Sequence, residues 1–326
     1  MSKKIGRLIN LGIGLEATRG TAVTAAYWLP KSNFTFADKV QKALSSSGYG
    51  NIGEGNQELV ALKWAEGDVE FDIVDKAFGL IAIATFGTVS SASEETTAYR
   101  HTFSLQNDNQ HDSLTFFVED STESIDLFFP MVMLNELKIN IVPEEVIKAT
   151  ASFISKSSGG SSALASDYVA ENKFVGRHAT VKIAAATGDL TAASKLNLRE
   201  MEITFSKNLM RDHALATVQA IDILNQKFEI TGTLTLDLED NTYMDYVLDG
   251  DYKALRLDIV NSDVTIGATS NPSFRIDLSR VAFDAWEPER PNDDIATQTV
   301  NFRALYDITN SNVINSCYLI NEVASY

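Results

Sequence analysis

The sequence predicts a mainly β protein built from two copies of one unit, and three observations support this. In residues 228–259, apolar residues or glycine alternate with polar ones from Phe228 to Leu238, as in a strand with one buried face. A short predicted helix follows, and the alternation resumes from Leu255 to Ile259. The pattern also occurs about 165 residues upstream, and a serine- and glycine-rich stretch separates the two occurrences.

The upstream match has no gap over seven positions, where residues 67–73 (GDVEFDI) align with residues 232–238 (GTLTLDL). Looser matches flank it, and they pair residues 33–36 with 202–205, Asp75 with Asp240, Phe78 with Tyr243, and 142–144 with 287–289. Several matches in the same order are much less expected by chance than one. The chain is therefore predicted to be an internal duplication.

Each copy is predicted to carry one short helix after this strand. In the second copy, Asp240 offers a side-chain oxygen to the first free amides, and Gly250 can end the helix in the left-handed conformation. In the first copy, Asp75 and Gly87 are expected to cap a helix over residues 76–86 in the same way.

The connection between the copies is predicted at residues 155–162 (SKSSGGSS), which have a flexible composition and no core residue. The predicted parts are an extended N-terminal arm (1–30), a first domain (31–155), a linker (156–165), a second domain (166–307) and a C-terminal arm (308–326). Further strands are predicted at residues 101–105, 114–118, 125–133, 137–142, 147–153, 181–185, 201–205, 274–283 and 299–306.

Two long connections interrupt the strands. Residues 37–58 form a predicted loop rich in Gly and Ser, which is either disordered or in contact with another subunit. Residues 206–226 occupy the same place in the second copy but carry many apolar residues, which predicts a docked or partly helical segment. A change of phase near Gly67 predicts a β-bulge, and residues 88–97 are predicted to be a mobile loop.

Composition excludes several classes of function. The net charge of −17 and the pI near 4.6 argue against a surface that grips nucleic-acid phosphates, although an acidic passage would keep a polyanion from sticking. The single cysteine, Cys317, cannot form an intrachain disulfide and is expected to be a buried thiol. No apolar run approaches the roughly 20 residues of a membrane span, so no membrane anchor is expected.

No pattern in the sequence predicts a reaction. The four histidines are scattered, and there is neither a nucleophile elbow nor an HExxH pattern. The acidic run Asp237-x-Glu239-Asp240 lacks the spacing and central glycine of a calcium loop. We therefore predict no catalytic residue, no metal and no cofactor.

Exposed apolar residues in the arms and loops predict contacts with other subunits, because such residues would be sticky if left uncovered. The residues expected at contacts between subunits or rings are Ile13, Leu15, Tyr27, Trp28, Tyr49, Ile52, Leu209, Met210, Ile314, Tyr318, Leu319 and Ile320. Two like β domains in tandem can pair edge to edge around a ring, and rings that stack through arms and loops would grow into a tube.

The sequence resembles the tail tube (major tail) proteins of long-tailed bacteriophages over nearly the whole chain. The resemblance lies in residues 11–22 (LGIGLEATRGTA) followed by Trp28, in residues 64–67 (WAEG) before a strand and helix, and in Asp294-Ile295 with the late strand Val300-x-Phe302-x-Ala304-Leu305. It implies a β-sandwich or open-barrel fold with one flanking helix per domain. Rings in this family are sixfold, so a duplicated chain implies three chains in a pseudo-hexameric ring.

The function expected from this resemblance is that of a structural virion protein without enzymatic activity. It would assemble in the host cytoplasm into the tube of a long non-contractile tail, with the tape-measure protein and then phage DNA in the lumen and with tail terminator and tail-tip proteins at the ends. Two alternatives remain at this point: a β-sandwich binding module of a tail tip or adhesin, and a carbohydrate-active enzyme.

Overall fold

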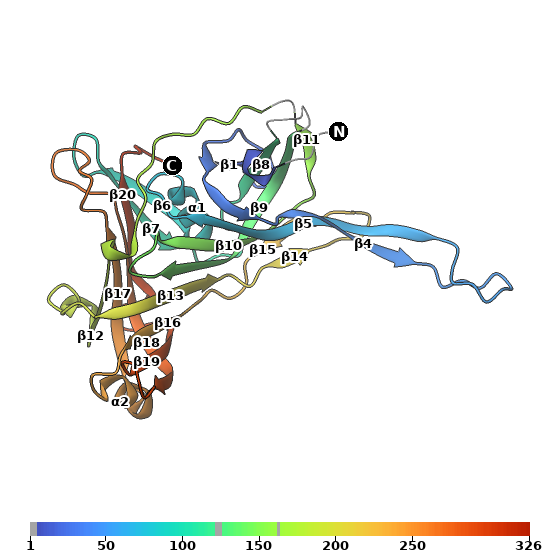
Figure 1. Ribbon diagram of the computed structural model, residues 1–326. Coiled ribbons are helices and arrows are strands. Elements are labelled where there is room, and N and C mark those ends of the chain that lie inside the picture. Colours follow the sequence, from blue (N-terminus) through green and yellow to red (C-terminus); the bar gives the residue numbers. More distant parts are fainter. Residues whose placement is uncertain (1–4, 121–125, 162–163) are drawn as a thin grey trace.

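Strands dominate the computed structural model, which describes residues 5–120, 126–161 and 164–326 (Figure 1). The elements up to residue 161 are β1 (Ile9–Leu15), β2 (Tyr27–Leu29), β3 (Lys31–Phe34), β4 (Ala37–Leu44), β5 (Glu58–Asp72), α1 (Phe78–Phe86), β6 (Gly87–Ser93), β7 (Tyr99–Leu105), β8 (Leu114–Asp120), β9 (Asp126–Ile141), β10 (Lys148–Ser155) and β11 (Gly159–Ser161).

The elements after residue 164 are β12 (Ala179–Ala184), β13 (Leu198–Ser206), β14 (Met210–Asp212), β15 (Asp222–Leu224), β16 (Glu229–Asp237), α2 (Thr242–Asp249), β17 (Tyr252–Val260), β18 (Ser273–Glu289), β19 (Thr297–Ala304) and β20 (Ile314–Asn321). Short 3-10 turns lie at Gly6–Leu8, Gly176–His178 and Thr187–Asp189. The prediction of a mainly β chain with two short helices is confirmed.

The same strand order occurs before and after residue 164. Before it, antiparallel pairing gives the orders β4-β5-β10-β9 and β1-β8-β9-β11. After it, the orders are β13-β16-β19-β18 and β12-β17-β18-β20. In each half one long strand, β9 or β18, passes from one set of strands to the other.

The irregularities of the two long strands also correspond. Where β9 passes β10, the register skips Asn135, and where β18 passes β19 it skips Asp284. A bulge inserts one unpaired residue and bends its strand. The bends therefore fall at the same place in each half, where the long strand leaves one set of strands for the other.

Strand register corrects the alignment of the two flanking sequence matches. In the gap-free match Val69 aligns with Leu234. Val69 pairs with Phe34 and Leu234 pairs with Met201, so the strand register aligns Phe34 with Met201, two residues from the expected alignment with Ile203. The pairings of β10 and β19 likewise align Leu137 with Trp286. The expected match of residues 142–144 with 287–289 is therefore four residues away from the alignment that the strand register gives. Loop lengths differ between the halves, so short matches outside the gap-free segment slip.

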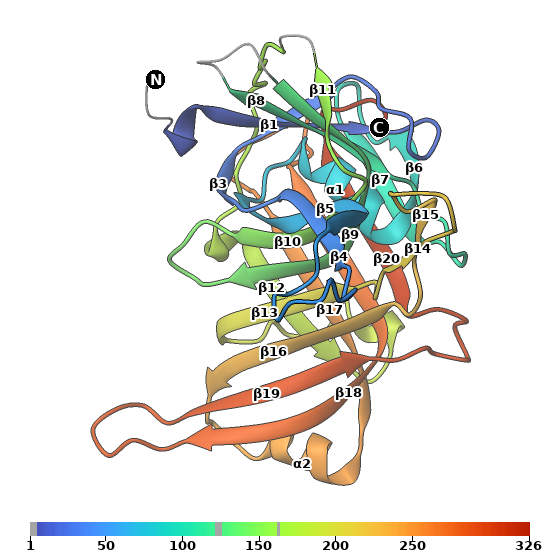
Figure 2. The ribbon, with the colours of Figure 1, turned by 90° about the vertical axis from the view of Figure 1, so that its right-hand side faces the viewer.

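Two pairings between strands join the halves, in addition to isolated bridges at Val74–Lys173 and Val146–Val175. β9 pairs with β13, with Ile139 opposite Ile203, and β7 pairs with β20, with Thr102 opposite Tyr318. The first pairing makes β4-β5-β10-β9 and β13-β16-β19-β18 one continuous row of eight strands. Figures 1 and 2 show how β9, β13, β16 and β19 follow one another through the molecule.

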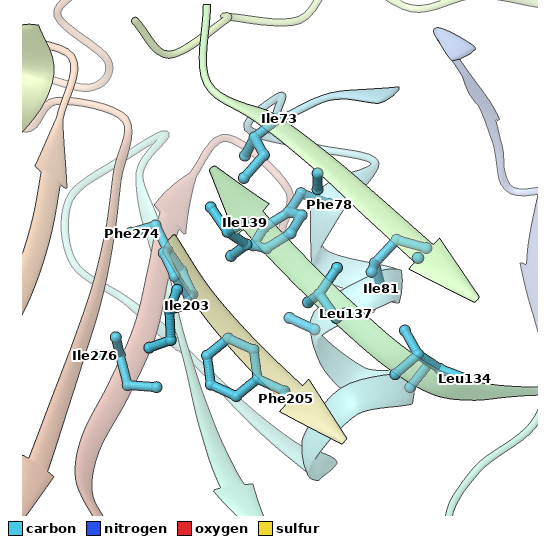
Figure 3. Packing of buried hydrophobic residues seen from close by; sticks show 14 of the residues in the cluster. Ile73, Phe78, Ile81, Leu134, Leu137, Ile139, Ile203, Phe205, Phe274 and Ile276 are labelled. Atoms are coloured by element: carbon cyan, nitrogen blue, oxygen red, sulfur yellow. The ribbon is translucent and has the colours of Figure 1, made fainter. Parts of the chain in front are cut away.

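One large cluster of buried apolar side chains extends through both halves (Figure 3). Helix α1 is apolar and buried on all sides, so it lies inside the protein rather than on a face. Its first residue, Phe78, meets Phe274 edge to face with 5.2 Å between ring centroids, and its last, Phe86, meets Phe205 at 5.6 Å. The helix thus packs against strands of the second half as well as its own.

Several predicted loops and arms are strands within the fold. Residues 37–58 supply β4 and the start of β5, which form a hairpin that projects from the body (Figure 1), and residues 88–97 include β6. Residues 206–226 contain the β14–β15 pair and no helix. The predicted N-terminal arm supplies β1 and β2, the predicted C-terminal arm supplies β20, and the predicted linker supplies β11; residues 162–163 of that linker lie outside the described residues.

The two glycine caps are where the sequence predicts them. Gly87 (φ 95°) and Gly250 (φ 68°) follow α1 and α2 in the left-handed conformation. Asp240 accepts a hydrogen bond from the Thr242 amide at 2.9 Å, at the start of α2. Asp75 has a different role from the predicted one, because its carboxylate accepts from the backbone and side chain of Asn172, both at 2.8 Å, and α1 begins only at Phe78.

Replacing Phe205 with alanine should lower the free energy of unfolding by about 3–5 kcal/mol, because the fully buried ring would leave a cavity beside Phe86. The neighbouring variant Thr204→Ala, on the opposite face of β13, should change it by less than about 1 kcal/mol. Urea denaturation of both variants measures the difference. Equal effects would contradict the burial of this strand face.

Candidate functional surfaces

The residues expected at subunit contacts divide into two groups. Ile13, Trp28, Tyr318, Leu319 and Ile320 are buried within the chain itself, and Leu15, Tyr27, Leu209 and Ile314 are half-buried. Tyr49, Ile52 and Met210 are exposed, with Ile52 fully so at the tip of the β4–β5 hairpin. Most residues of the first group are buried by strand pairing near the chain ends, whereas Leu209 packs on the cluster that includes Met131 and Ile223; their sequence pattern revealed neither.

The row of eight strands has one buried and one polar face. The polar sheet face consists of the side chains on β5 (from Asp68), β9 (from Glu136), β10, β13, β16, β18 (from Ala285) and β19 that alternate with the buried ones. Its ten carboxylates are Asp68, Glu70, Asp72, Glu136, Glu200, Glu202, Glu229, Asp237, Glu287 and Glu289, and its four cations are Lys138, Lys148, Arg199 and Arg303. Threonine occupies positions 150, 204, 231, 233, 235, 297 and 299 of this face.

The polar sheet face has no aromatic member and is therefore unsuited to stacking bases. Its excess of carboxylates also repels phosphates. Where β9 meets β13, Lys138 and Glu202 form an ion pair of 2.6 Å across the junction of the halves. The face can therefore border a polyanion without holding it.

The row ends in two strand edges without a partner among the described residues. β4 pairs only with β5, and β18 pairs only with β19 from Phe283 onward, since its pairing with β17 stops at Ala282. Unpaired edges present free amides and carbonyls and are ready to pair with another chain. These two edges lie at opposite ends of the same row.

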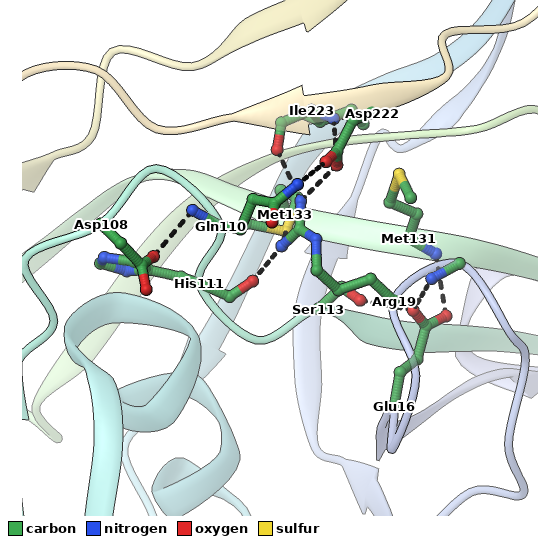
Figure 4. A network of polar contacts seen from close by, with 11 residues as sticks. Glu16, Arg19, Asp108, Gln110, His111, Ser113, Met131, Met133, Asp222 and Ile223 are labelled. Carbon is green, nitrogen blue, oxygen red and sulfur yellow. Dashed lines mark hydrogen bonds and ion pairs between the residues drawn. The ribbon is translucent and has the colours of Figure 1, made fainter.

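A buried carboxylate organises the turn after β1 (Figure 4). Glu16 accepts hydrogen bonds from the amides of Gly20 (2.6 Å) and Met131 (2.9 Å), and from the hydroxyls of Ser113 (2.5 Å) and Thr115 (2.8 Å). Four donors satisfy the lone pairs that a buried carboxylate would otherwise leave unmet. The turn over residues 16–20 is thereby fixed to β8 and β9.

Arg19 in that turn holds the β14–β15 pair of the second half against the first half (Figure 4). Its guanidinium donates to the Asp222 carboxylate at 2.5 Å, to the Ile223 carbonyl at 2.8 Å and to the His111 carbonyl. Beneath these contacts, Ala220 and Ile223 pack on Met131 and Met133. The segment predicted as docked is indeed docked, within its own chain.

A cavity of about 330 Å³ lies next to this contact, with Asp108, His111, Lys207 and Asn225 in its wall. Burial lowers the pKa of the Lys207 ammonium to about 7 and that of His111 to about 4. Lys207 Nζ donates to the Ala84 carbonyl in the last turn of α1 at 2.6 Å. The lysine therefore joins the two halves, and nothing in this geometry resembles a nucleophile with its base.

The residues that the structure describes contain no cluster of metal-binding side chains and no membrane-spanning helix. No group of three or more His, Cys, Asp or Glu side chains there could hold a metal ion. No helix there is both long and apolar enough to cross a membrane. Cys317 is a free thiol and fully buried, as predicted.

Replacing Arg19 with alanine should release the β14–β15 segment, because Asp222 would stay largely buried without its cation. A loss of about 3 kcal/mol in local stability corresponds to roughly 100-fold faster amide exchange over residues 209–225. Hydrogen exchange with mass spectrometry measures this. The matched control, Lys227→Ala, removes an exposed ion pair with Glu229 and should leave exchange nearly unchanged; equal exchange in both variants would refute the role of Arg19.

The stability of the protein should rise with pH between about 7 and 10.5 because of Lys207. The folded-state pKa of about 7 lies below the ordinary 10.5, so in this window the unfolded chain binds a proton that the folded chain does not. The variant Lys207→Met removes this term. Urea denaturation at pH 7 and pH 9.5 should therefore give a larger gain for the native sequence than for the variant, and parallel curves would contradict the assignment.

Comparison with known protein families identifies the chain. A family model described as "Phage tail tube protein" matches residues 6–304, which is more than nine-tenths of the chain. No curated protein matches the chain. Members of this family polymerise into the tube, so the expected structural, non-enzymatic role is confirmed and neither the binding-module nor the enzyme alternative is needed. The chain belongs to the phage tail tube protein family and is a structural component of the virion tail.

Proposed function

We propose that this chain is a duplicated tail tube subunit, that three chains close into a pseudo-hexameric ring, and that stacked rings form the tube of a long non-contractile tail. The observation that carries the proposal is the pairing of β9 with β13 inside one chain. If the two halves are copies of one tube domain, with the linker between them near residues 156–165, this pairing is the ring contact already made once.

The matching strand orders support the duplication. β4, β5, β10 and β9 occupy the places that β13, β16, β19 and β18 occupy in the second half, and α1 and α2 follow corresponding strands. The bulges at Asn135 and Asp284 correspond as well. A shared core is compatible with duplication, because copies that never separate can merge their apolar faces.

Ring closure follows by repeating the internal contact between chains. The outer edge of β18 in one chain would pair with β3 and β4 of the next, as β9 pairs with β13. In the strand register, Ile139 corresponds to Pro288 and Ile203 to Phe36. The pair Ile139–Ile203 inside one chain would therefore become Pro288 of one chain opposite Phe36 of the next. Pairing around the ring then covers both free edges of every chain.

The number of strands sets the size of the lumen. Each chain contributes eight strands to the row, so three chains give 24 strands. At about 4.8 Å between strands, such a barrel is about 37 Å across at the backbone when its strands run along the axis, and wider when they tilt. Barrels of 16–18 strands already leave an aqueous channel.

The polar sheet face would line this lumen, because the opposite face is covered by the core. Its carboxylates and threonines offer no stacking platform and repel phosphates, which suits the passage of DNA and, before it, of the tape-measure protein. Tail terminator and tail-tip proteins would meet the two ends of the tube. The exposed residues Tyr49, Ile52 and Met210 are the best placed of the predicted contact residues to meet a neighbouring chain.

Native mass measurement of assembled particles tests the stoichiometry. A ring of three chains has a mass of about 107 kDa, three times 35.7 kDa, and larger particles should be multiples of it. Electron microscopy of end-on particles should show threefold symmetry with six similar lobes. Rings of six chains, at about 214 kDa, would overturn the proposed stoichiometry, and particles without a lumen would overturn the ring itself.

A further inference from the structure

The connection that contains β14–β15 in the second half docks on the protein. Its counterpart in the first half, which contains the β4–β5 hairpin, has nearly the same length but projects from the body. Strand register equates Phe36 with Ile203 and Gly67 with Gly232, because each glycine lies opposite its partner. The chain advances 31 positions between the first-half residues (36 to 67) and 29 positions between the second-half residues (203 to 232). The second-half segment folds back as β14–β15, whereas the first-half segment extends as the β4–β5 hairpin (Figure 1).

The surface that receives β14–β15 in the first half can be located in the second half by register. Met131 corresponds to Arg280 and Ile154 to Arg303 through the pairings of β9 with β10 and of β18 with β19. The segment before β8 that receives Asp222 and Asn225 corresponds to the segment before β17. We call the second-half counterpart, consisting of Tyr252, Arg280, Arg303 and Tyr306, the second-half patch.

The second-half patch is exposed, and it includes large side chains with apolar surface. The exposed fractions of Tyr252 and Tyr306 are 48% and 58%. The Arg280 guanidinium carbon lies 3.8 Å from the centroid of the Tyr252 ring. Beside them, a cavity of about 330 Å³ is bordered by Ala186, Tyr252, Arg280 and Asp307.

The cavity lies where the first half is filled by its own turn. Strand register equates Glu16 with Ala186 and Arg19 with Asp189. The second half therefore lacks both the carboxylate that fixes the turn and the arginine that holds the docked segment, and Arg280 takes the place of Met131. Arg303 already pairs with Asp284 at 3.5 Å, and Asp307 borders the cavity, so an occupant of this surface must chiefly bring apolar groups and can add an acidic one beside Arg280.

We propose that the β4–β5 hairpin of a neighbouring copy of this chain docks on the second-half patch, as β14–β15 docks on the first half. The hairpin supplies the required chemistry: Leu44, Tyr49, Ile52 and Leu59 have exposed fractions of 52%, 60%, 108% and 56%, and Glu54 lies at the tip. The glycines at 48, 50, 53 and 55 let the tip adapt to the patch.

The geometry of the ring places the β4–β5 hairpin of one chain beside the second-half patch of the next. This inference rests on the proposed ring, in which β4 of one chain lies beside β18 of the next. In the chain itself, β13 lies beside β9, and the segment that follows β13 docks on the half that carries β9. By the same path, the segment that follows β4 reaches the half that carries β18, where the second-half patch lies. The docked hairpins would lock adjacent chains together.

Disulfide trapping tests the contact. The Ile52→Cys chain is polymerised together with the Tyr306→Cys chain under mild oxidation, and a covalent dimer of about 71 kDa, twice 35.7 kDa, is expected on a non-reducing gel. Cys317 is fully buried and does not compete. The matched control pairs Val169→Cys with Tyr306→Cys, since Val169 is 47% exposed and lies outside both surfaces, and it should give no dimer.

Charge insertion gives a second readout. Ile52→Asp and Tyr306→Asp should each reduce the yield of tubes at least tenfold, while Val169→Asp should leave it unchanged. Tubes of normal yield from both variants, or normal tubes without the Ile52–Tyr306 cross-link, would overturn the docking while leaving the ring proposal intact. Failure of the native sequence to form threefold rings would instead overturn the proposed function.

Discussion

The pairing of β9 with β13 is the contact on which the rest of the structure depends. It joins four strands from each half into one row and places Ile139 opposite Ile203 on the buried face and Lys138 near Glu202 on the polar one. A sheet edge must be paired, covered or blunted, since its free amides and carbonyls otherwise invite other chains. The junction satisfies one edge of each half and leaves the other edge of each half at the ends of the row.

A family whose members polymerise needs such unsatisfied edges. In a monomeric protein the edges of β4 and β18 would be a liability, whereas in the proposed ring they would be the means of assembly. The long strands β9 and β18 connect the row to the rest of the fold. Each pairs with a strand of the row along one part and with a strand outside the row, β11 or β20, along the other. Contacts made on the row are thereby tied to the packing of α1 and its surrounding phenylalanines.

The two halves are not equivalent in their surface chemistry. The first half has Glu16 and Arg19 and holds the β14–β15 segment, whereas the second half has Ala186 and Asp189 at the corresponding positions. Under the proposed duplication the copies would be free to diverge, because a contact within the chain would no longer have to serve between chains as well. The docked segment and the projecting hairpin would then be two forms of one ancestral connection.

The sequence by itself determined the alternation of the strands, the gap-free match of residues 67–73 with 232–238, the glycine caps and the acidic character, because these depend on neighbours along the chain. It also led to the family through residues 11–22 and the late strand at residues 300–305. Only the tertiary structure decided that β1 and β20 lie within the sheets, that Asp75 binds Asn172 rather than capping a helix, and that Arg19 reaches Asp222. The Asp75 and Arg19 contacts join residues 97 and 203 positions apart, and no local pattern encodes which distant partner a free edge or a charged group will meet.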